Sequence, residues 1–414
     1  MKSLKITIFE GFKLNDVTKN RKIFHFNPTC EIAIANQSPY YNAPELLANF
    51  EEELATLMVF FANSGDHVLK EMGVDENFRK TLDLLGLSEV KLTSKKNSLE
   101  LLHNEAVELA PWGWSPAEVN YLSAYNQIKE QKVYTKKTIN SDLFERKHAI
   151  RFLTQITEEY PNSLFPDKHQ QPQILRSVEE VESFLLQKQQ IVLKSPLSSS
   201  GRGLQVIRKN QLNTSNIQWI NTNLKQQKYL VGEPLFDKLA DLSFQFEIKS
   251  ETEVFFHGIS QFRTNKNGQY LGHYLNPSPD TLSEYVSAGL LTELTKQLLN
   301  GLRDNLFSKH YRGFLGIDAL IFLDEKQVKI HPCLEINPRC NMGILSKRIE
   351  QRIHPESCGQ FEIYYNPQQN FLDFTKLETK KNPPETEDQL LRKGFVALTA
   401  PSKNSKFGAY IRLF

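Results

Sequence analysis

Short apolar runs alternate with longer amphipathic segments in the first third of the chain. Strands are expected at 4–9 and 32–35, and helices at 44–61, 76–85, 116–128 and 141–160. Two of these helices begin with residues that helix N-termini prefer, Pro44 before Glu45 and Ser115 before Pro116. Because strands alternate with helices, the pattern predicts an α/β unit.

From residue 191 onward the pattern becomes a succession of short apolar strands. They are expected at 191–194, 204–207, 229–231, 242–248, 254–262, 314–323 and 328–337, with a helix at 283–306. The polar segment 366–389 contains Pro383 and Pro384, and we interpret it as a linker or surface excursion. A last hairpin is predicted from strands at 395–399 and 409–413. The whole chain therefore combines α/β and α+β character.

The composition is that of a folded protein and restricts its partners. The 414 residues are 40% hydrophobic and 24% charged, and the net charge of +2 argues against a general nucleic-acid binder. No apolar run reaches the roughly 18–20 residues of a membrane span, and residues 1–11 lack the cleavage site of a secretory signal. The four cysteines form no CxxC pair, so we expect no disulfide framework or structural zinc, and a reducing cytoplasm.

A strand that ends in Lys194 leads into a loop rich in serine and glycine. The loop contains Ser198, Ser199, Ser200, Gly201 and Gly203. Glycines let backbone N–H groups approach a phosphate, serines add hydroxyl donors, and Lys194 adds a positive charge. The loop is not a Walker A motif, because no GK[ST] follows it and a strand comes next. An ordinary hairpin turn would use the same residue types.

Polar side chains interrupt the last two long apolar strands. Asp318 lies between apolar neighbours, where a lone carboxylate is costly to bury unless it is paired or binds a metal. Strand alternation places Glu335 and Asn337 on one face, and with Asp318 they offer three oxygen donors for Mg²⁺ or Mn²⁺. Arg339 follows, where it can meet a phosphate or a carboxylate. The alternatives are a salt-bridged aspartate and an amphipathic, half-exposed strand.

Between these two features, an apolar strand ends in Gly-Glu-Pro at 232–234. The backbone of Leu230 and Val231 is suited to pair with an adenine edge. Glu233 is suited to accept a hydrogen bond from a ribose or an amino group. A plain strand followed by a turn would have the same sequence.

Taken in this order, the motifs resemble the ATP-grasp superfamily over roughly residues 140–345. The residues that carry the resemblance are Lys194, the loop 198–203, Glu233, Asp318 and the run Glu335-Ile-Asn337-Pro-Arg339. It implies an ATP-grasp fold with ATP between two lobes: the loop covers the phosphates, and the two acids with Asn337 hold Mg²⁺. It also implies a Rossmann-like pre-grasp domain at 1–135, the ATP-grasp region at 136–345 and a C-terminal extension at 346–414.

Several neighbouring residues are candidates for the same site. Members of the superfamily commonly have a second phosphate-binding lysine or arginine before the loop. Asp142 stands near that place here, with Arg146 and Lys147 beside it, and we take Lys147 as the candidate. Asp241 would contact ribose or substrate, or lie on a solvated turn. Arg263 would contact phosphate or a substrate carboxylate, as Arg339 would during phosphoryl transfer.

Other polar and aromatic residues are given structural roles. His257, His273 and His331 are interpreted as ordinary hydrogen-bonded histidines. The pair Trp112 and Trp114 is interpreted as packing, although it would also suit the capping of a planar substrate. Residues 26–29 follow an apolar run, and ligands gather at such strand ends in open α/β sheets, although a plain turn has the same sequence.

The resemblance implies an ADP-forming ligase. Such an enzyme activates a small-molecule carboxylate as an acyl phosphate, which an amine or a thiol then attacks, and it needs no protein nucleophile. An ATP-grasp small-molecule kinase and an inactive ATP-binding regulatory protein remain alternatives. We expect ATP and Mg²⁺ or Mn²⁺ as cofactors, no nucleic-acid or membrane partner, and a homodimer as a possible assembly.

Overall fold

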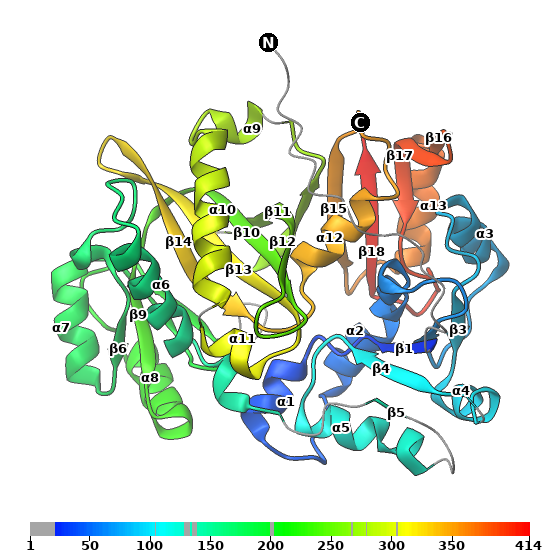
Figure 1. Cartoon of the computed structure of the whole chain (residues 1–414), viewed down its shortest axis with the longest axis horizontal. Helices are drawn as coiled ribbons and strands as arrows, with labels where there is room; N and C mark the ends of the chain where they lie inside the picture. Colours follow the sequence, from blue (N-terminus) through cyan, green and yellow to red (C-terminus); the bar gives the residue numbers. More distant parts are fainter. Residues whose placement is uncertain are drawn as a thin grey trace.

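The computed structural model describes residues 21–103, 105–127, 133–134, 139–198, 203–265, 268–278, 280–303 and 305–414. Within these residues the strands form sheets of five, nine and four strands, which we name the parallel sheet, the central sheet and the small sheet. In Figure 1 the small sheet and its helices lie on the left, the central sheet lies in the middle and right, and the parallel sheet lies at the lower right.

The parallel sheet has the strand order β3-β2-β1-β4-β5. Its strands are β1 (Arg21–His25), β2 (His67–Leu69), β3 (Lys91–Thr93), β4 (Val107–Pro111) and β5 (Val133–Tyr134). The helices between them are α1 (Cys30–Asn36), α2 (Glu45–Leu54), η1 (Ala55–Phe61), α3 (Glu76–Leu84), α4 (Lys95–Leu101), α5 (Pro116–Leu122) and η2 (Ser123–Gln127). This order confirms the Rossmann-like unit and places its switch point, where ligands gather, between β1 and β4.

The strand predicted at 32–35 is wrong, because these residues lie in α1. Cys30, Ala33 and Ile34 are buried. Their spacing of three and four residues is that of one helix face, which a run of four residues could not reveal. The strand predicted at 4–9 lies outside the described residues. The predicted cap at Ser115 is confirmed, since its side chain accepts a hydrogen bond from Glu118 N.

The small sheet is antiparallel and carries helices on one side. Its strands, in the order β6-β9-β7-β8, are β6 (Gln173–Leu175), β9 (Leu230–Pro234), β7 (Ile191–Lys194) and β8 (Leu204–Ile207). The helices are α7 (Val178–Lys188) and α8 (Thr214–Gln227), and the segment before the sheet holds η3 (Ser141–Phe144), α6 (Lys147–Glu159) and η4 (Lys168–Gln170). The helix predicted at 141–160 is thus divided into η3 and α6.

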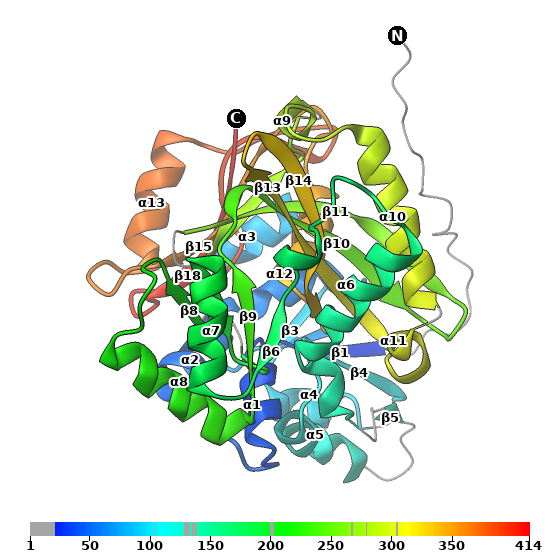
Figure 2. The same cartoon turned by 90° about the vertical axis from the view of Figure 1, so that its left-hand side faces the viewer.

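The central sheet has the order β14-β13-β10-β11-β12-β15-β18-β17-β16. Its strands are β10 (Asp237–Ile248), β11 (Val254–Thr264), β12 (Tyr270–Leu275), β13 (Gly313–Asp324), β14 (Gln327–Asn337), β15 (Gly359–Tyr365), β16 (Glu385–Glu387), β17 (Leu390–Ala397) and β18 (Phe407–Leu413). The accompanying helices are α9 (Asp280–Ser283), α10 (Ala288–Arg303), α11 (Leu306–His310), α12 (Met342–Glu350) and α13 (Phe371–Lys381). Figure 2 shows α10 and α13 on opposite sides of the molecule.

Two predicted segments of this region need correction. The helix expected at 283–306 begins later, at Ala288, because the Ser287 hydroxyl accepts a hydrogen bond from Leu290 N and so caps the helix there. The polar segment 366–389 is not a linker, since it contains α13, capped by Asn370 and anchored by the fully buried Phe371. The final hairpin is confirmed by β17 and β18.

The central sheet divides a core from an open face. On β10, Leu242 and Phe244 are buried in the core, while the alternate residues Asp241 and Ser243 face the other way and line a cleft. The strands β15–β18 continue this same sheet. The boundaries 1–135, 136–345 and 346–414 remain predictions.

Two exclusions from the sequence can be compared with the structure. All four cysteines are free. Within the described part of the chain, no helix combines the length and apolar character needed to span a membrane.

Candidate active site

A cleft of about 940 Å³ is lined by both the small sheet and the central sheet. The small sheet contributes side chains of β7, β8 and β9, and the central sheet contributes the open face of β10–β15. Loops at the carboxyl ends of β1 and β4 close it with Pro28 and Trp112, so the switch point of the parallel sheet opens into the same cleft.

The three predicted metal ligands lie together in this cleft. Asp318 and Glu335 face each other in register across β13 and β14, and Asn337 Nδ2 donates to Asp318 Oδ2 at 3.0 Å. Burial raises the pKa of Asp318 above its usual range, and the negative charge of Glu335 raises it further. A divalent cation would relieve both effects, and an all-oxygen donor set fits Mg²⁺.

The cation site has two acids and one amide. Among the described residues, no three His, Cys, Asp or Glu side chains are grouped to hold a metal ion. The third protein ligand would therefore be the carbonyl oxygen of Asn337, which already accepts a hydrogen bond from Arg339 Nη2 at 3.0 Å and keeps a second lone pair. Such a partial set is typical of Mg²⁺ sites completed by water and phosphate oxygens.

Arg146, at the start of α6, is the second cation of the site. Its Nη1 lies 2.5 Å from Glu335 Oε1, its Nε donates to Ser195 O at 3.0 Å, and its Nη2 donates to Ser198 Oγ at 3.0 Å. The side chain is 8% exposed and lines the cleft. It therefore ties the metal-ligand strand to the loop after β7.

Lys147 was predicted for this place, and the structure does not bring it to the cleft. Successive residues of a helix point about 100° apart, so Arg146 and Lys147 cannot share a direction. Lys147 instead forms ion pairs with Asp142 and Glu145. The two cations are adjacent in the sequence, and no local pattern indicates which of them reaches the cleft.

Lys194 forms a buried ion pair with Glu233. The Nζ–Oε2 distance is 2.6 Å, and both side chains are 7% exposed. Both residues line the cleft, on neighbouring strands β7 and β9. Removing either charge would leave the other buried and unpaired, which is strongly unfavourable.

The predicted adenine edge at Leu230 and Val231 does not line the cleft. Both residues are buried, and β9 is paired on both sides, with β6 and β7, so its backbone groups are already used. The cleft is lined instead by residues 233–236, where β9 ends. The strand prediction was correct, but a buried middle strand offers no free edge to a ligand.

The serine–glycine loop is described only at its two ends. Ser198 lines the cleft, and Gly203 packs so closely that a Cβ there would lie 2.3 Å from Ser198 Cβ. Only glycine fits this position without a shift. The predicted residues Ser199, Ser200 and Gly201 lie outside the described residues.

Asp241 and Arg263 lie on opposite faces of the central sheet. Asp241 lines the cleft and accepts hydrogen bonds from Lys238 Nζ at 2.6 Å and Thr264 Oγ1 at 2.9 Å. Arg263 follows Phe262, which faces the cleft, and strand alternation turns it to the far side, where it pairs with Glu362. The predicted role of Arg263 in the site is therefore wrong.

Arg339 reaches the cleft and is held by Glu31 of α1. Its Nε lies 3.0 Å from Glu31 Oε1, and its Nη2 donates to Glu31 Oε2 at 3.1 Å. Glu31 is 5% exposed and was not predicted, because the residues around it were expected to form a strand. This contact joins helix α1 to the residues that follow β14.

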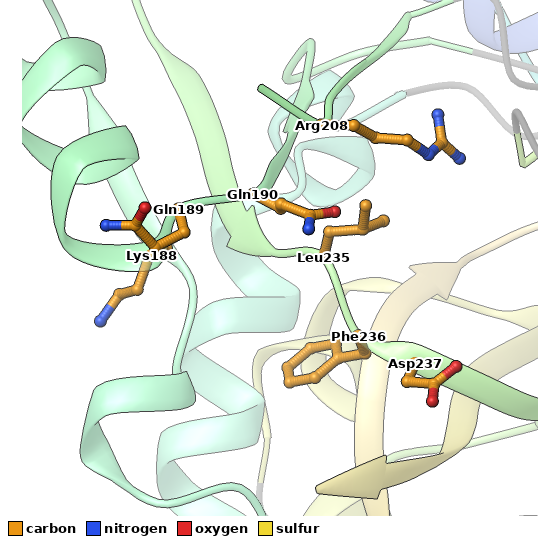
Figure 3. Close-up of a pocket in the computed structure, with 7 residues that line it drawn as sticks. All are labelled: Lys188, Gln189, Gln190, Arg208, Leu235, Phe236 and Asp237. Atoms are coloured by element: carbon orange, nitrogen blue, oxygen red, sulfur yellow. The ribbon is translucent and has the colours of Figure 1, made fainter. Parts of the chain in front are cut away.

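A shallow depression of about 470 Å³ adjoins the cleft where β9 leads into β10 (Figure 3). It shares Arg208 and residues 235–237 with the cleft. In Figure 3, Arg208 points away from Lys188 and Gln189 at the end of α7. The depression is the outer end of the cleft rather than a second site.

The sequence matches neither a family model nor a curated protein. Solved structures are similar over nearly the whole chain. Biotin carboxylase from Campylobacter jejuni is 12% identical, with a TM-score of 0.51 over 96% of this chain and 88% of that one. The biotin carboxylase domain of the Hydrogenobacter thermophilus 2-oxoglutarate carboxylase is 11% identical, with a TM-score of 0.50 over 95% and 86% of the two chains. The chain has the ATP-grasp fold.

Proposed function

We propose that this protein is an ATP- and divalent-metal-dependent ligase. It activates a small-molecule carboxylate as an acyl phosphate, with release of ADP, for attack by an amine or a thiol. One observation carries the proposal: a pair of facing acids and three cationic side chains, Arg146, Lys194 and Arg339, line a single cleft between two sheets.

The two cations on the small-sheet side would hold the phosphates. Lys194 stands at the end of β7, and Arg146 is fixed to the loop after it through Ser195 O and Ser198 Oγ. Both side chains already have carboxylate partners, Glu233 and Glu335. Their positions are therefore fixed before ATP arrives, so binding requires little reorganisation.

Asp318, Glu335 and Asn337 would hold the metal ion. A divalent cation held by these residues would supply positive charge that neutralises the charge developing on the phosphate. Glu335 contacts Arg146 as well, so the same carboxylate would orient a metal ligand set and a phosphate-binding guanidinium. Loss of Glu335 should therefore disturb two parts of the site at once.

Arg339 would hold the carboxylate that becomes activated. Its guanidinium lies beside Asn337 and Glu31, between the metal ligands and the loops of the parallel sheet. A carboxylate oxygen attacks the γ-phosphorus, the bond to the β,γ-bridging oxygen breaks, and ADP leaves. The amine or thiol then attacks the acyl carbon, the C–O bond to phosphate breaks, and inorganic phosphate leaves.

The nucleotide part is tested by thermal unfolding with MgADP. Saturation at 100 times the dissociation constant adds about 2.7 kcal/mol of stability. We expect this shift in the wild type and a smaller one in the double variant Asp318→Asn, Glu335→Gln. Asp324→Asn serves as the control, because Asp324 lies at the far end of β13 and pairs with Lys329. Equal shifts in all three proteins would refute the metal site, and the absence of a shift in the wild type would refute the nucleotide site.

The reaction itself is tested with hydroxylamine as the amine. An acyl phosphate gives a hydroxamate with this nucleophile, which added ferric ion turns into a coloured complex, so ADP and hydroxamate should appear together when a suitable acid is present. A small-molecule kinase would form ADP without hydroxamate. A regulatory protein would bind MgADP and form neither product. Each alternative is thus distinguished from the ligase.

A further inference from the structure

The floor of the cleft changes character from one side of the central sheet to the other. On β10, β13 and β14 the residues that line it are mainly polar. On β11, β12 and β15 they include Phe262, Leu271 and Ile363, which are apolar. We name this second part the apolar arm; among its polar side chains is His273, which the proposed phosphate and metal chemistry does not use.

Strand register explains why these side chains share a face. His273 is paired with Phe262 on β11 and with Phe361 on β15. Directly paired residues in an antiparallel sheet point to the same side, and so do residues two positions apart. Leu271 and Ile363 therefore stand beside His273 on the cleft side of the sheet.

The imidazole of His273 is buried with one nitrogen unused. The residue is 2% exposed, and its Nδ1 lies 2.6 Å from the hydroxyl of Tyr270. Its Nε2 has no hydrogen-bond partner among the described residues. A buried polar atom without a partner costs free energy, so its presence in a cleft wall points to a ligand that completes it.

The protonation of His273 decides what that ligand must offer. Burial and, to a smaller extent, the positive charge of Lys347 lower the pKa of the ring to about 3, so the ring is neutral near pH 7. Burial also keeps the pKa of Tyr270 well above its usual range, so its hydroxyl keeps its proton. Among the described residues this hydroxyl has no hydrogen-bond partner other than His273, so we take it to donate its proton to Nδ1. The ring proton is then on Nε2, and the ligand must supply an acceptor.

Aromatic side chains extend this surface beyond the sheet. Tyr365 stacks on Phe407 with 4.6 Å between ring centroids, and Phe407 meets Phe50 at 5.2 Å. Phe26 then lies 5.0 Å from Trp112. Tyr365, Phe50 and Trp112 all line the cleft that contains the apolar arm. Rings of this kind bind planar apolar groups well.

We propose that the apolar arm binds the body of the carboxylic acid that the enzyme activates, an uncharged group of aromatic size whose oxygen acceptor receives a hydrogen bond from Nε2–H of His273. This inference rests on the proposed function. Three strand spacings, about 14 Å, separate β13 from β12, so the acid is elongated, with its carboxylate and its acceptor at opposite ends.

Two matched acids test the proposal. The first is 3-(4-acetylphenyl)propanoate, and the second is 3-(4-isopropylphenyl)propanoate, in which a methyl group replaces the carbonyl oxygen. Hexanoate serves as the aliphatic reference. Binding of each is measured by calorimetry to the full chain saturated with MgADP. We expect both aromatic acids to bind at least tenfold more tightly than hexanoate, and the acetyl compound about tenfold more tightly than the isopropyl compound.

Variants then assign the difference to His273. His273→Phe keeps a ring of similar size and removes the donor, so the preference for the acetyl compound should fall to about onefold, with the isopropyl compound bound as before. Tyr270→Phe removes the group that fixes the tautomer and should reduce the preference to about threefold. Binding of MgADP should be unchanged in both variants, which shows that they are folded and separates the apolar arm from the nucleotide site.

The outcomes are distinct. A preference for the acetyl compound that survives in His273→Phe would overturn the role of His273. Equal binding of hexanoate and the aromatic acids, or no binding of any of them to the MgADP complex, would overturn the whole inference and leave the nucleotide site standing. Failure of MgADP itself to bind would instead refute the proposed function.

Discussion

The two ends of the cleft floor lie on one face of the central sheet, but they differ in whether their polar groups have partners. At the end formed by β13 and β14, the charged groups have partners: Glu335 contacts Arg146, and Arg339 contacts Glu31. At the end formed by β11, β12 and β15, the surroundings are apolar, and Nε2 of His273 has no partner among the described residues. An unpaired buried charge costs far more than an unpaired neutral N–H.

This difference indicates how each end receives a ligand. At the charged end, the protein groups are already paired with one another. A ligand that binds there must replace one of these partners, so it has to carry a charge of the same sign as the group that it replaces. At the apolar end, a ligand adds a hydrogen bond without breaking one. Changes at the charged end should therefore have large effects, and changes at the apolar end should alter selectivity more than rate.

The largest effect is expected at Glu335. Glu335→Gln removes one of the two acids of the cation site and the ionic partner of Arg146. We expect metal-dependent formation of ADP to fall by about three orders of magnitude, roughly 4 kcal/mol in the barrier. A titration of rate against Mg²⁺ checks this, with Asp324→Asn as the control at the far end of β13. Normal turnover in Glu335→Gln would contradict the assignment of the metal site.

Arg146 should have the next largest effect. Arg146→Gln keeps one hydrogen-bonding group and removes the charge, so we expect kcat/KM for ATP to fall about 10- to 100-fold, or 1.4–2.8 kcal/mol. Lys147→Gln is the matched control, because the neighbouring lysine is paired with Asp142 and Glu145 away from the cleft. If the two variants lost activity equally, the choice between these cations would be wrong.

A smaller loss is expected at the end of the serine–glycine loop. In Gly203→Ala the new Cβ would meet Ser198 Cβ at 2.3 Å, so the loop must shift. We expect KM for ATP to rise about tenfold, with kcat nearly unchanged. Gly73→Ala is the control, since a Cβ at Gly73 meets nothing within 4 Å. Isothermal titration with MgADP measures the same change directly, and equal affinity in both variants would exclude a role for the close packing of Gly203.

The sequence was informative where chemistry follows strand alternation. Glu335 and Asn337 are two residues apart, so their shared face could be predicted from the period of a strand alone. Their position opposite Asp318 depends on the pairing of β13 with β14, which the order of motifs in the chain anticipated. The same alternation, applied with the correct register, would have excluded Arg263, which follows a cleft-facing phenylalanine.

The sequence was not informative where function depends on contacts between distant segments. Glu31 contacts Arg339, which lies some three hundred positions later in the sequence. Glu31 belongs to α1, a helix whose short apolar run predicts a strand. His273 was interpreted as an ordinary structural histidine, because no local pattern shows that one ring nitrogen lacks a partner. The polar composition of 366–389 indicates a linker or surface excursion, although Phe371 anchors a helix there.

The smallest effects concern two histidines with opposite surroundings. Burial lowers the pKa of His25, but Glu118, 2.8 Å from its Nδ1, outweighs burial and raises the pKa above its ordinary value. Its contribution to stability is therefore complete below pH 6.5 and is lost as pH rises through the raised pKa. The difference in unfolding free energy between wild type and His25→Gln should shrink between pH 6 and pH 8, as measured by urea unfolding.

His273 should show the opposite trend, because it has no carboxylate partner. With its pKa lowered to about 3, it must stay neutral in the fold while the unfolded chain takes up a proton below pH 6.5. Its contribution is present above pH 6.5 and is lost by up to about 1.4 kcal/mol for each pH unit as pH falls toward 3. The advantage of wild type over His273→Phe should shrink from pH 6.5 to pH 5 in the same urea series. A parallel trend for both histidines would contradict the contrast between a ring with a carboxylate partner and a ring without one, because the two pKa shifts have opposite signs.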